Sequence, residues 1–423
     1  MRPVKTTPMQ FKRILRALQH RNYRLFYAGQ SISLIGTWMQ RIAMSWLVYR
    51  LTGSTFLLGA VGFAGQIPTF LLAPFTGVLV DRYNRHRILI VTQMLAMIQA
   101  LTLALLILTK VIAIPHIIFL SVFLGIVNAF DMPARQSFLV DMVEEKEDLG
   151  NAIALNSSMV NAARLLGPSI AGMLIAAVGE GMCFLLNSIS YVAVIAALYA
   201  MKITPRPTIP KRTNMLMELR EGFAYAFDSI PIRSVLMLLG LVSLMGMPYS
   251  ALMPVFAENI LGGGPHTLGF LMGASGLGAL SGAIFLAARQ SVRGLEKVIT
   301  LAATLFGAGL MAFALSRVLW LSLALMVLTG FGMMVLMAAS NTILQTRVDD
   351  DKRGRVMSLY TMAFMGTVPF GSLFAGSVAS RIGAPNTLMI GGIACILGAC
   401  LFSRQLASFR KIEGEGAAEV LGK

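Results

Sequence analysis

The sequence has little charge for its length. Only 13% of its 423 residues are Asp, Glu, Lys or Arg, whereas 56% are hydrophobic. In a typical soluble protein about 25% of all residues are charged, and most of them lie on the surface that water can reach. The composition therefore excludes an ordinary soluble globule and predicts a protein that is embedded in a lipid bilayer.

Cysteine and histidine are also scarce. The three cysteines fall within apolar runs, which predicts buried thiols rather than disulfides, and the four histidines are scattered, so no metal site is predicted. No phosphate-binding loop of the Walker type is present, which argues against ATP hydrolysis. We expect neither a cofactor nor an enzyme activity, because no nucleophile, base and orienting group share a motif.

Acidic residues are half as common as basic ones. The chain has 19 Asp and Glu against 35 Lys and Arg, giving a net charge of +16. Such an excess is typical of nucleic-acid-binding proteins, but here most basic residues lie on one side of the apolar runs. The exceptions are Arg50, Lys110, Arg317 and Arg381 on the other side and Arg41 and Arg164 within the runs. The positive-inside rule then predicts a bacterial inner-membrane protein with both termini in the cytoplasm and no nucleic-acid partner.

Long apolar runs dominate the sequence. Twelve of them reach the roughly 20 residues that a helix needs to cross a bilayer. The predicted helices cover residues 24–50, 54–80, 87–109, 115–134, 150–178, 180–201, 234–260, 266–288, 297–316, 318–344, 355–381 and 385–404. We predict an all-α integral membrane protein with twelve transmembrane helices in two pseudo-symmetric six-helix bundles.

The longest interruption divides the chain. We expect a cytoplasmic N-terminal segment (1–23), an N-terminal bundle (24–201), a cytoplasmic linker (202–233), a C-terminal bundle (234–404) and a cytoplasmic tail (405–423). Within the linker, apolar residues recur at helical spacing, which predicts an amphipathic helix. They are Leu216, Leu219, Phe223 and Phe227.

The two halves resemble each other. With a constant offset, Gly150, Leu155, Gly167, Ala171 and Gly172 correspond to Gly354, Leu359, Gly371, Ala375 and Gly376. A parallel repeat of six helices is typical of carriers whose site lies between the halves. Chance alignment of glycines in glycine-rich helices is the alternative.

One polar stripe follows the first predicted helix. Its residues recur every three or four positions: Gln30, Ser33, Thr37, Gln40, Arg41 and Ser45. Polar groups that face lipid lack partners, so we expect this stripe to line a substrate cavity. For Arg41, the alternative is that its side chain extends to the outer membrane surface.

The fourth and fifth predicted helices carry further candidates. Asp131 and Arg135 are four residues apart and can pair on one face with Asn128 nearby, so Asp131 is the candidate for proton coupling. A structural salt bridge is the alternative. Asn161 and Arg164 are candidates for the cavity, where Arg164 can anchor an anionic group or pair with another helix. In the second half, Asn341 is the cavity candidate.

Two glycine-containing segments are candidates for gating. The loop after the second helix contains Gly77, Asp81, Arg82, Arg85 and Arg87, and Gly77 is expected to let two helices approach closely. The fifth helix contains Gly167, Pro168 and Gly172, which predict a kink and tight packing.

These motifs resemble the major facilitator superfamily. The loop Gly77 to Arg87, the stretch from Gly36 to Gln40 and the segment from Asp131 to Arg135 are similar to the branch that includes enterobactin exporters and multidrug and macrolide efflux proteins. The resemblance implies that Asp81 and the loop arginines help close a cytoplasmic gate, and that Gly167, Pro168 and Gly172 form an antiporter motif. Ala171 replaces one of the usual paired glycines in that motif, which weakens the inference about protons.

We therefore predict a monomeric secondary transporter that exports a small amphipathic molecule, such as a siderophore or a drug, by alternating access and in exchange for protons. A lysophospholipid flippase is the first alternative, because methionine-rich helices offer an apolar lining. A membrane scaffold or receptor without transport activity is the second.

Overall fold

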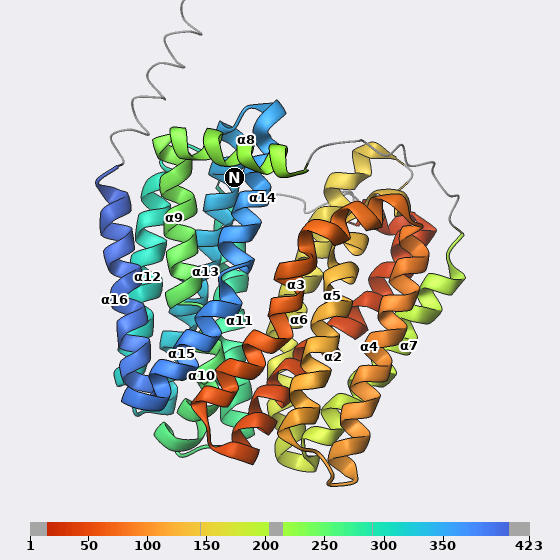
Figure 1. The fold of residues 1–423 in the computed structure, drawn as a ribbon, viewed down its shortest axis with the longest axis vertical. Coiled ribbons are helices and arrows are strands. Elements are labelled where there is room, and N and C mark those ends of the chain that lie inside the picture. Colours follow the sequence, from red (N-terminus) through yellow and green to blue (C-terminus); the bar gives the residue numbers. More distant parts are fainter. Residues whose placement is uncertain (1–14, 144, 203–214, 290, 406–423) are drawn as a thin grey trace, which may run out of the picture. The chain divides into compact units, whose positions relative to one another are not determined.

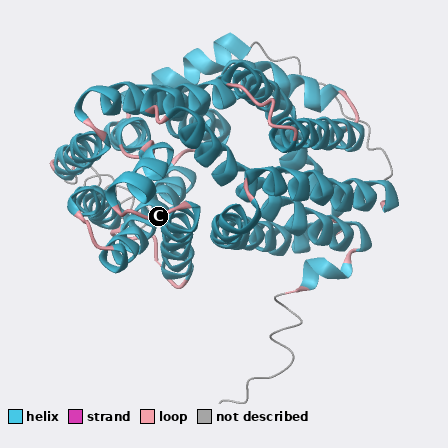
Figure 2. Cartoon of the chain, turned by 90° about the horizontal axis from the view of Figure 1, so that it is seen from below, coloured by secondary structure: helices cyan, strands magenta, loops and turns pink. Residues whose placement is uncertain are grey.

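The computed structural model describes residues 15–143, 145–202, 215–289 and 291–405, without the side chains of residues 74, 78, 81, 146, 215–220, 350 and 351. This part of the chain is helical and contains no strand (Figures 1 and 2). It confirms the all-α prediction.

The helices follow the predicted apolar runs closely. In chain order they are η1 (Arg16–Gln19), α2 (Arg21–Thr52), α3 (Thr55–Arg82), α4 (Arg85–Leu108), α5 (Ile114–Met142), η2 (Lys146–Asp148), α6 (Leu149–Val178), α7 (Glu180–Ala200), α8 (Met215–Asp228), α9 (Ile230–Met245), α10 (Tyr249–Val255), η3 (Phe256–Ile260), α11 (Pro265–Ala287), α12 (Leu295–Leu315), α13 (Leu319–Arg347), α14 (Asp350–Met365), α15 (Val368–Ile382) and α16 (Ala384–Ser403). Helix α8 lies where the amphipathic helix was predicted.

Two predicted helices are broken in the structure. The run predicted over 234–260 ends as α9 at Met245, resumes as α10 after Pro248, and finishes in the π-helical turn η3. The run predicted over 355–381 is divided between α14 and α15, and Pro369 lies in the first turn of α15. Proline has no backbone N–H to donate to the preceding turn, which explains both interruptions.

Eleven segments of the described chain are long and apolar enough to cross a membrane. The remaining candidate, α2, spans 32 residues, which is ample for a crossing. Its hydropathy is lowered by the polar stripe that includes Gln40 and Arg41. The architecture therefore agrees with the predicted twelve crossings.

Contacts divide the chain into two compact units. The first contains residues 1–44 and 67–210, and the second contains residues 45–66 and 211–423. The end of α2 and the first part of α3 thus belong with the second unit, so the first unit differs from the predicted bundle of residues 24–201.

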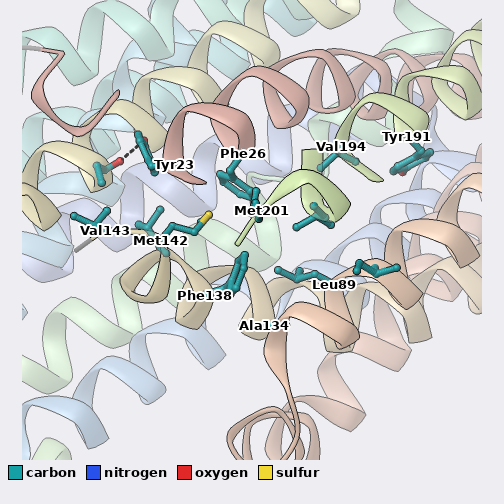
Figure 3. Close-up of a cluster of buried hydrophobic side chains, with 14 of the residues drawn as sticks. Tyr23, Phe26, Leu89, Ala134, Phe138, Met142, Val143, Tyr191, Val194 and Met201 are labelled. Carbon is teal, nitrogen blue, oxygen red and sulfur yellow. Dashed lines mark hydrogen bonds between the residues drawn. The ribbon is translucent and has the colours of Figure 1, made fainter. Parts of the chain in front are cut away.

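The first unit has a continuous apolar core (Figure 3). Large buried side chains from α2, α4, α5 and α7 meet there, including Phe26, Leu89, Phe138 and Val194. The Tyr23 hydroxyl at the edge of this core donates a hydrogen bond of 2.8 Å to the backbone carbonyl of Ala152. The bond satisfies a polar group that burial would otherwise leave unpaired.

Aromatic contacts join several elements of the second unit. The ring centroids of Phe256 and Phe313 lie 4.7 Å apart, and Tyr249 packs edge to face against Phe306. The Tyr249 hydroxyl also lies 2.8 Å from the Ser275 hydroxyl oxygen. These contacts link α10 and η3 to α11 and α12.

Equivalent glycines of the predicted repeat make equivalent contacts. In the first unit, a Cβ atom at Gly167 of α6 would lie 3.0 Å from the Ile35 carbonyl oxygen of α2. In the second unit, a Cβ atom at Gly371 of α15 would lie 2.8 Å from Cγ of Pro248, directly after α9. Both glycines permit close packing against the first helix of their half, which supports a real repeat over chance alignment.

Candidate functional site

The polar stripe of α2 does not face one way. Gln30, Ser33 and Gln40 are buried, whereas Thr37 is half-buried and Arg41 is exposed. Successive residues of a helix point about 100° apart, because a turn contains 3.6 residues. The neighbours Gln40 and Arg41 consequently lie on different sides of α2.

Gln40 lies inside the bundle rather than on a cavity face. Its Nε2 atom donates to Oε1 of Gln99 in α4 at 2.9 Å, and its Oε1 atom accepts from Nδ2 of Asn187 in α7 at 2.6 Å. Gln99 in turn donates to the backbone carbonyl of Leu120 in α5. This chain of bonds fixes four helices against one another and satisfies each buried amide, as a membrane interior requires.

Asp131 is buried at the contact between α4 and α5. Its Oδ1 atom accepts hydrogen bonds from the Thr92 hydroxyl at 2.9 Å and from Nε2 of Gln93 at 2.7 Å. Its Oδ2 atom lies 2.8 Å from Nη2 of Arg135, one turn further along α5. The carboxylate therefore has a charged partner and two neutral donors, which offset its burial.

Two arginines meet one tryptophan on the first unit. The guanidinium carbon of Arg41 lies 4.8 Å from the Trp38 ring centroid, and that of Arg164 in α6 lies 5.7 Å from the same ring. Trp38 itself packs against the apolar cluster between α2 and α6. The ring thus holds two cations near each other within membrane-spanning helices.

The three asparagines predicted to line the cavity lie on three different helices. Asn128 is half-buried in α5. Asn161 donates to the Ser157 backbone carbonyl in its own helix. In the second unit, Oδ1 of Asn341 accepts a hydrogen bond from Gln345.

The predicted gating loop is partly described. Arg82 and Arg87 are exposed, whereas Nη1 of Arg85 lies 3.3 Å from Oδ2 of Asp141 at the end of α5. The side chain of Asp81 lies outside the described part of the chain. A Cβ atom at Gly77 would meet no described atom within 4 Å, so the close helix approach expected at this glycine is absent from this structure.

Gly167 of α6 makes a close packing contact of the kind predicted for it. Gly167, Pro168 and Gly172 are buried, and a Cβ atom at Gly167 would lie 2.5 Å from Cβ of Trp38. Pro168 lies inside the helix. Among the residues that the structure describes, no group of His, Cys, Asp and Glu is arranged to hold a metal ion.

Sequence reasoning missed several polar partners. Thr92, Gln93, Gln99 and Asn187 lie in predicted spans, and their polarity within apolar runs was the available signal. It also missed Asp148, the last residue of η2 before α6, whose carboxylate contacts His20 and Arg16. No sequence spacing indicates that last contact, because its partners are more than a hundred residues away.

Comparison with known proteins agrees with this architecture. A family profile described as "Transmembrane secretion effector" matches residues 14–418. The chain is 26% identical to the staphyloferrin A transporter of Staphylococcus aureus over 88% of this chain and 93% of that protein. It is 23% identical to macrolide efflux protein A of Streptococcus pyogenes, over 90% and 96%, and 24% identical to the enterobactin exporter EntS of Escherichia coli, over 93% of each chain.

Solved structures show the same fold. A bacterial homologue of the human lysosomal transporter Spinster superposes with a TM-score of 0.72 at 14% identity, covering 93% of this chain and 98% of that one. The POT family transporter PepTSo gives a TM-score of 0.72 at 12% identity, covering 93% of this chain and 99% of that one. The chain is a multi-pass membrane transporter, and it belongs to the transmembrane secretion effector family within the major facilitator superfamily.

Proposed function

We propose that the protein is a secondary exporter that moves a small amphipathic molecule, a siderophore or a drug, out of the cell in exchange for protons. The relatives that match along nearly the whole chain carry the names of siderophore transporters and efflux proteins, which supports the direction and the class of cargo. The distribution of Lys and Arg supports cytoplasmic termini in the inner membrane, and the proposed exporter acts as a monomer.

The site around Asp131 carries the proposal of proton coupling. Among the described spans, Asp131 is the acidic residue that lies away from a helix end and is buried, at 4% exposure. An ionisable group at such a depth is costly to retain and is therefore a functional candidate. Proton binding at Asp131 would change its pairing with Arg135. The ionised carboxylate pairs with Arg135, and the protonated carboxyl group releases that arginine.

Gln93 is suited to both protonation states of Asp131. Its Nε2 atom donates to the ionised carboxylate, while its Oε1 atom is buried and has no hydrogen-bond partner in the described structure. A rotation of the amide would present Oε1 as an acceptor for the hydroxyl of a protonated Asp131. The groups facing Asp131 are then Thr92 and Gln93 from α4 and Arg135 from α5.

Transport by purified protein in liposomes tests the proposal. Uptake of enterobactin and of a labelled macrolide is followed with an imposed pH gradient and again after an ionophore has collapsed it. We expect gradient-driven accumulation of at least one of the two. The Asp131→Asn variant should lose that accumulation, because an amide cannot exchange a proton, yet retain exchange of substrate across the membrane.

The control is Glu147→Gln, which removes an arginine-paired carboxylate that is 87% exposed outside the membrane-spanning helices. This variant should respond to the gradient as the parent does. Accumulation that is indifferent to the gradient, or an Asp131→Asn variant that still concentrates substrate, would contradict proton coupling. Failure of both compounds to move would contradict the proposed cargo.

A further inference from the structure

We propose that Trp38, Arg41 and Arg164 form a binding site for an organic anion with two or more carboxylate-like groups, so that the exported molecule is a multivalent anion. This inference rests on the proposed function for its biological meaning. The binding site itself stands on the geometry of the first unit.

Arg41 is the starting point. Among the described residues, the Arg41 guanidinium makes no hydrogen bond or ion pair. It lies over the face of the Trp38 ring, in a cation–π contact. Its side chain is exposed although it lies well inside α2. A guanidinium carries five N–H donors, and a cation–π contact uses none of them. The group is therefore positioned to receive an acceptor that reaches this face of the helix.

Arg164 supplies a second positive charge to the same place. Because both guanidinium groups lie over one indole ring, their separation cannot exceed the two ring distances added together. Arg41 is also within electrostatic range of Arg164 and Arg135. Arg135 is already paired with Asp131. Like charges held together in this way favour an anion between them.

Gly167 explains how the second arginine reaches the ring. It lies three residues after Arg164 on the same face of α6, and its missing side chain allows α6 to approach Trp38 closely. The planar ring then fixes the two guanidinium groups, whose forked donors match carboxylate geometry. Trp38 is a positioning residue in this arrangement, and its apolar face can also contact the hydrocarbon part of an amphipathic ligand.

Fluorescence of Trp38 provides a direct test. The sequence contains three tryptophans, so the full-length variant Trp46→Phe with Trp320→Phe reports on Trp38 alone. This variant is placed in nanodiscs of phosphatidylcholine and titrated with cyclohexane-1,3,5-tricarboxylate, which has no ring absorption of its own. We expect a saturable change in Trp38 emission, and no change with the uncharged trimethyl ester of the same acid.

Arginine variants in that background assign the response to the site. Arg41→Gln and Arg164→Gln should each raise the Kd at least tenfold, and Arg41→Lys should raise it less because it keeps the charge. The matched control is Arg24→Gln, which removes an exposed arginine near the start of α2, about four helical turns before Trp38. This control should bind as the parent does.

Three results would overturn the proposal: no binding of the tricarboxylate, equal binding of its ester, or equal binding after both arginines are replaced. An equal change in emission when phosphatidylglycerol is added to the discs would assign the site to lipid headgroups and would also overturn it. Tricarboxylate binding without any transport would leave this site standing while contradicting the proposed function. Gradient-driven transport that is unaffected by Arg41→Gln would contradict this proposal alone.

Discussion

Asp148 shows how a single buried carboxylate can depend on two basic partners. Oδ2 of Asp148 lies 2.9 Å from Nε2 of His20, and Oδ1 accepts a hydrogen bond from Nε of Arg16. The hydrogen bond from His20 is the main influence that lowers the pKa of Asp148; desolvation opposes it, and Arg16 reinforces it. The contact fastens η1, at the start of the described chain, to the turn before α6.

The lowered pKa of Asp148 predicts a pH-dependent contribution to stability. An unfolded Asp titrates near pH 3.9, so the contribution of the folded carboxylate is complete above about pH 4 and is lost as the pH falls through its lower folded pKa. Asp148→Asn should therefore melt at a lower temperature than the parent at pH 7, and the difference should shrink below about pH 4. Scanning fluorimetry in detergent measures both.

Glu147→Gln is the control for this prediction. Glu147 is 87% exposed and lies 3.5 Å from the same Arg16. Exposed ion pairs contribute little because water screens them, so this variant should melt as the parent does at each pH. A pH-independent loss in Asp148→Asn would mean that the residue matters for packing and not for its charge.

At the scale of the helix, α6 shows why a glycine can be essential at one position and replaceable at another. A Cβ atom added at Gly167 would lie 2.5 Å from Cβ of Trp38, whereas one added at Gly150 would meet no atom of the described residues within 4 Å. The sequence predicted tight packing for the first of these, because glycine beside proline within an apolar run is typical of helix contacts. It also predicted a close approach at Gly77, where a Cβ atom would meet none of the described atoms within 4 Å. Composition alone does not reveal which face of a helix meets a neighbour.

Alanine substitution separates the two glycines of α6. Gly167→Ala should lower the free energy of unfolding by about 1–3 kcal/mol, because the added methyl group forces α2 and α6 apart. Gly150→Ala should leave stability unchanged or raise it by up to about 1 kcal/mol, since alanine favours the helix. Thermal melts in detergent, or unfolding in denaturant, would show the contrast. Equal effects of the two substitutions would contradict the packing shown by the structure.

At the scale of the molecule, hydropathy predicted the helices and their order well. Runs of apolar residues fix the length of a membrane crossing, so most helix ends lie within a few residues of their predicted positions. The partners of polar side chains were harder to predict. Gln40 was placed on a cavity face from its spacing along α2, yet its bonds to Gln99 and Asn187 lie within the bundle. Contacts between distant helices determine such partners, and helical periodicity carries no information about them.

Residues 45–66 should keep the amino-terminal and carboxyl-terminal parts of the chain associated after a cut in the linker, because they belong to the second unit. In the second unit, a Cβ atom at Gly59 of α3 would lie 3.0 Å from Cα of Gly376 in α15, and the Thr55 hydroxyl donates to the Gly376 carbonyl at 3.3 Å. Tyr49 likewise accepts a hydrogen bond of 2.6 Å from Asn259. If the polypeptide is cut in the linker, the amino-terminal piece still carries residues 45–66, which pack with the carboxyl-terminal piece. We call this segment the latch.

Separate production of residues 1–210 and 211–423 in one cell tests this latch. An affinity tag on the second fragment should retrieve the first fragment from detergent extracts. Gly59→Leu should reduce the recovery several-fold, because its side chain would meet the backbone of α15, whereas Gly150→Leu should not. Undiminished recovery with Gly59→Leu would place the latch elsewhere. The two fragments of this transporter would thus assemble without a covalent connection between them.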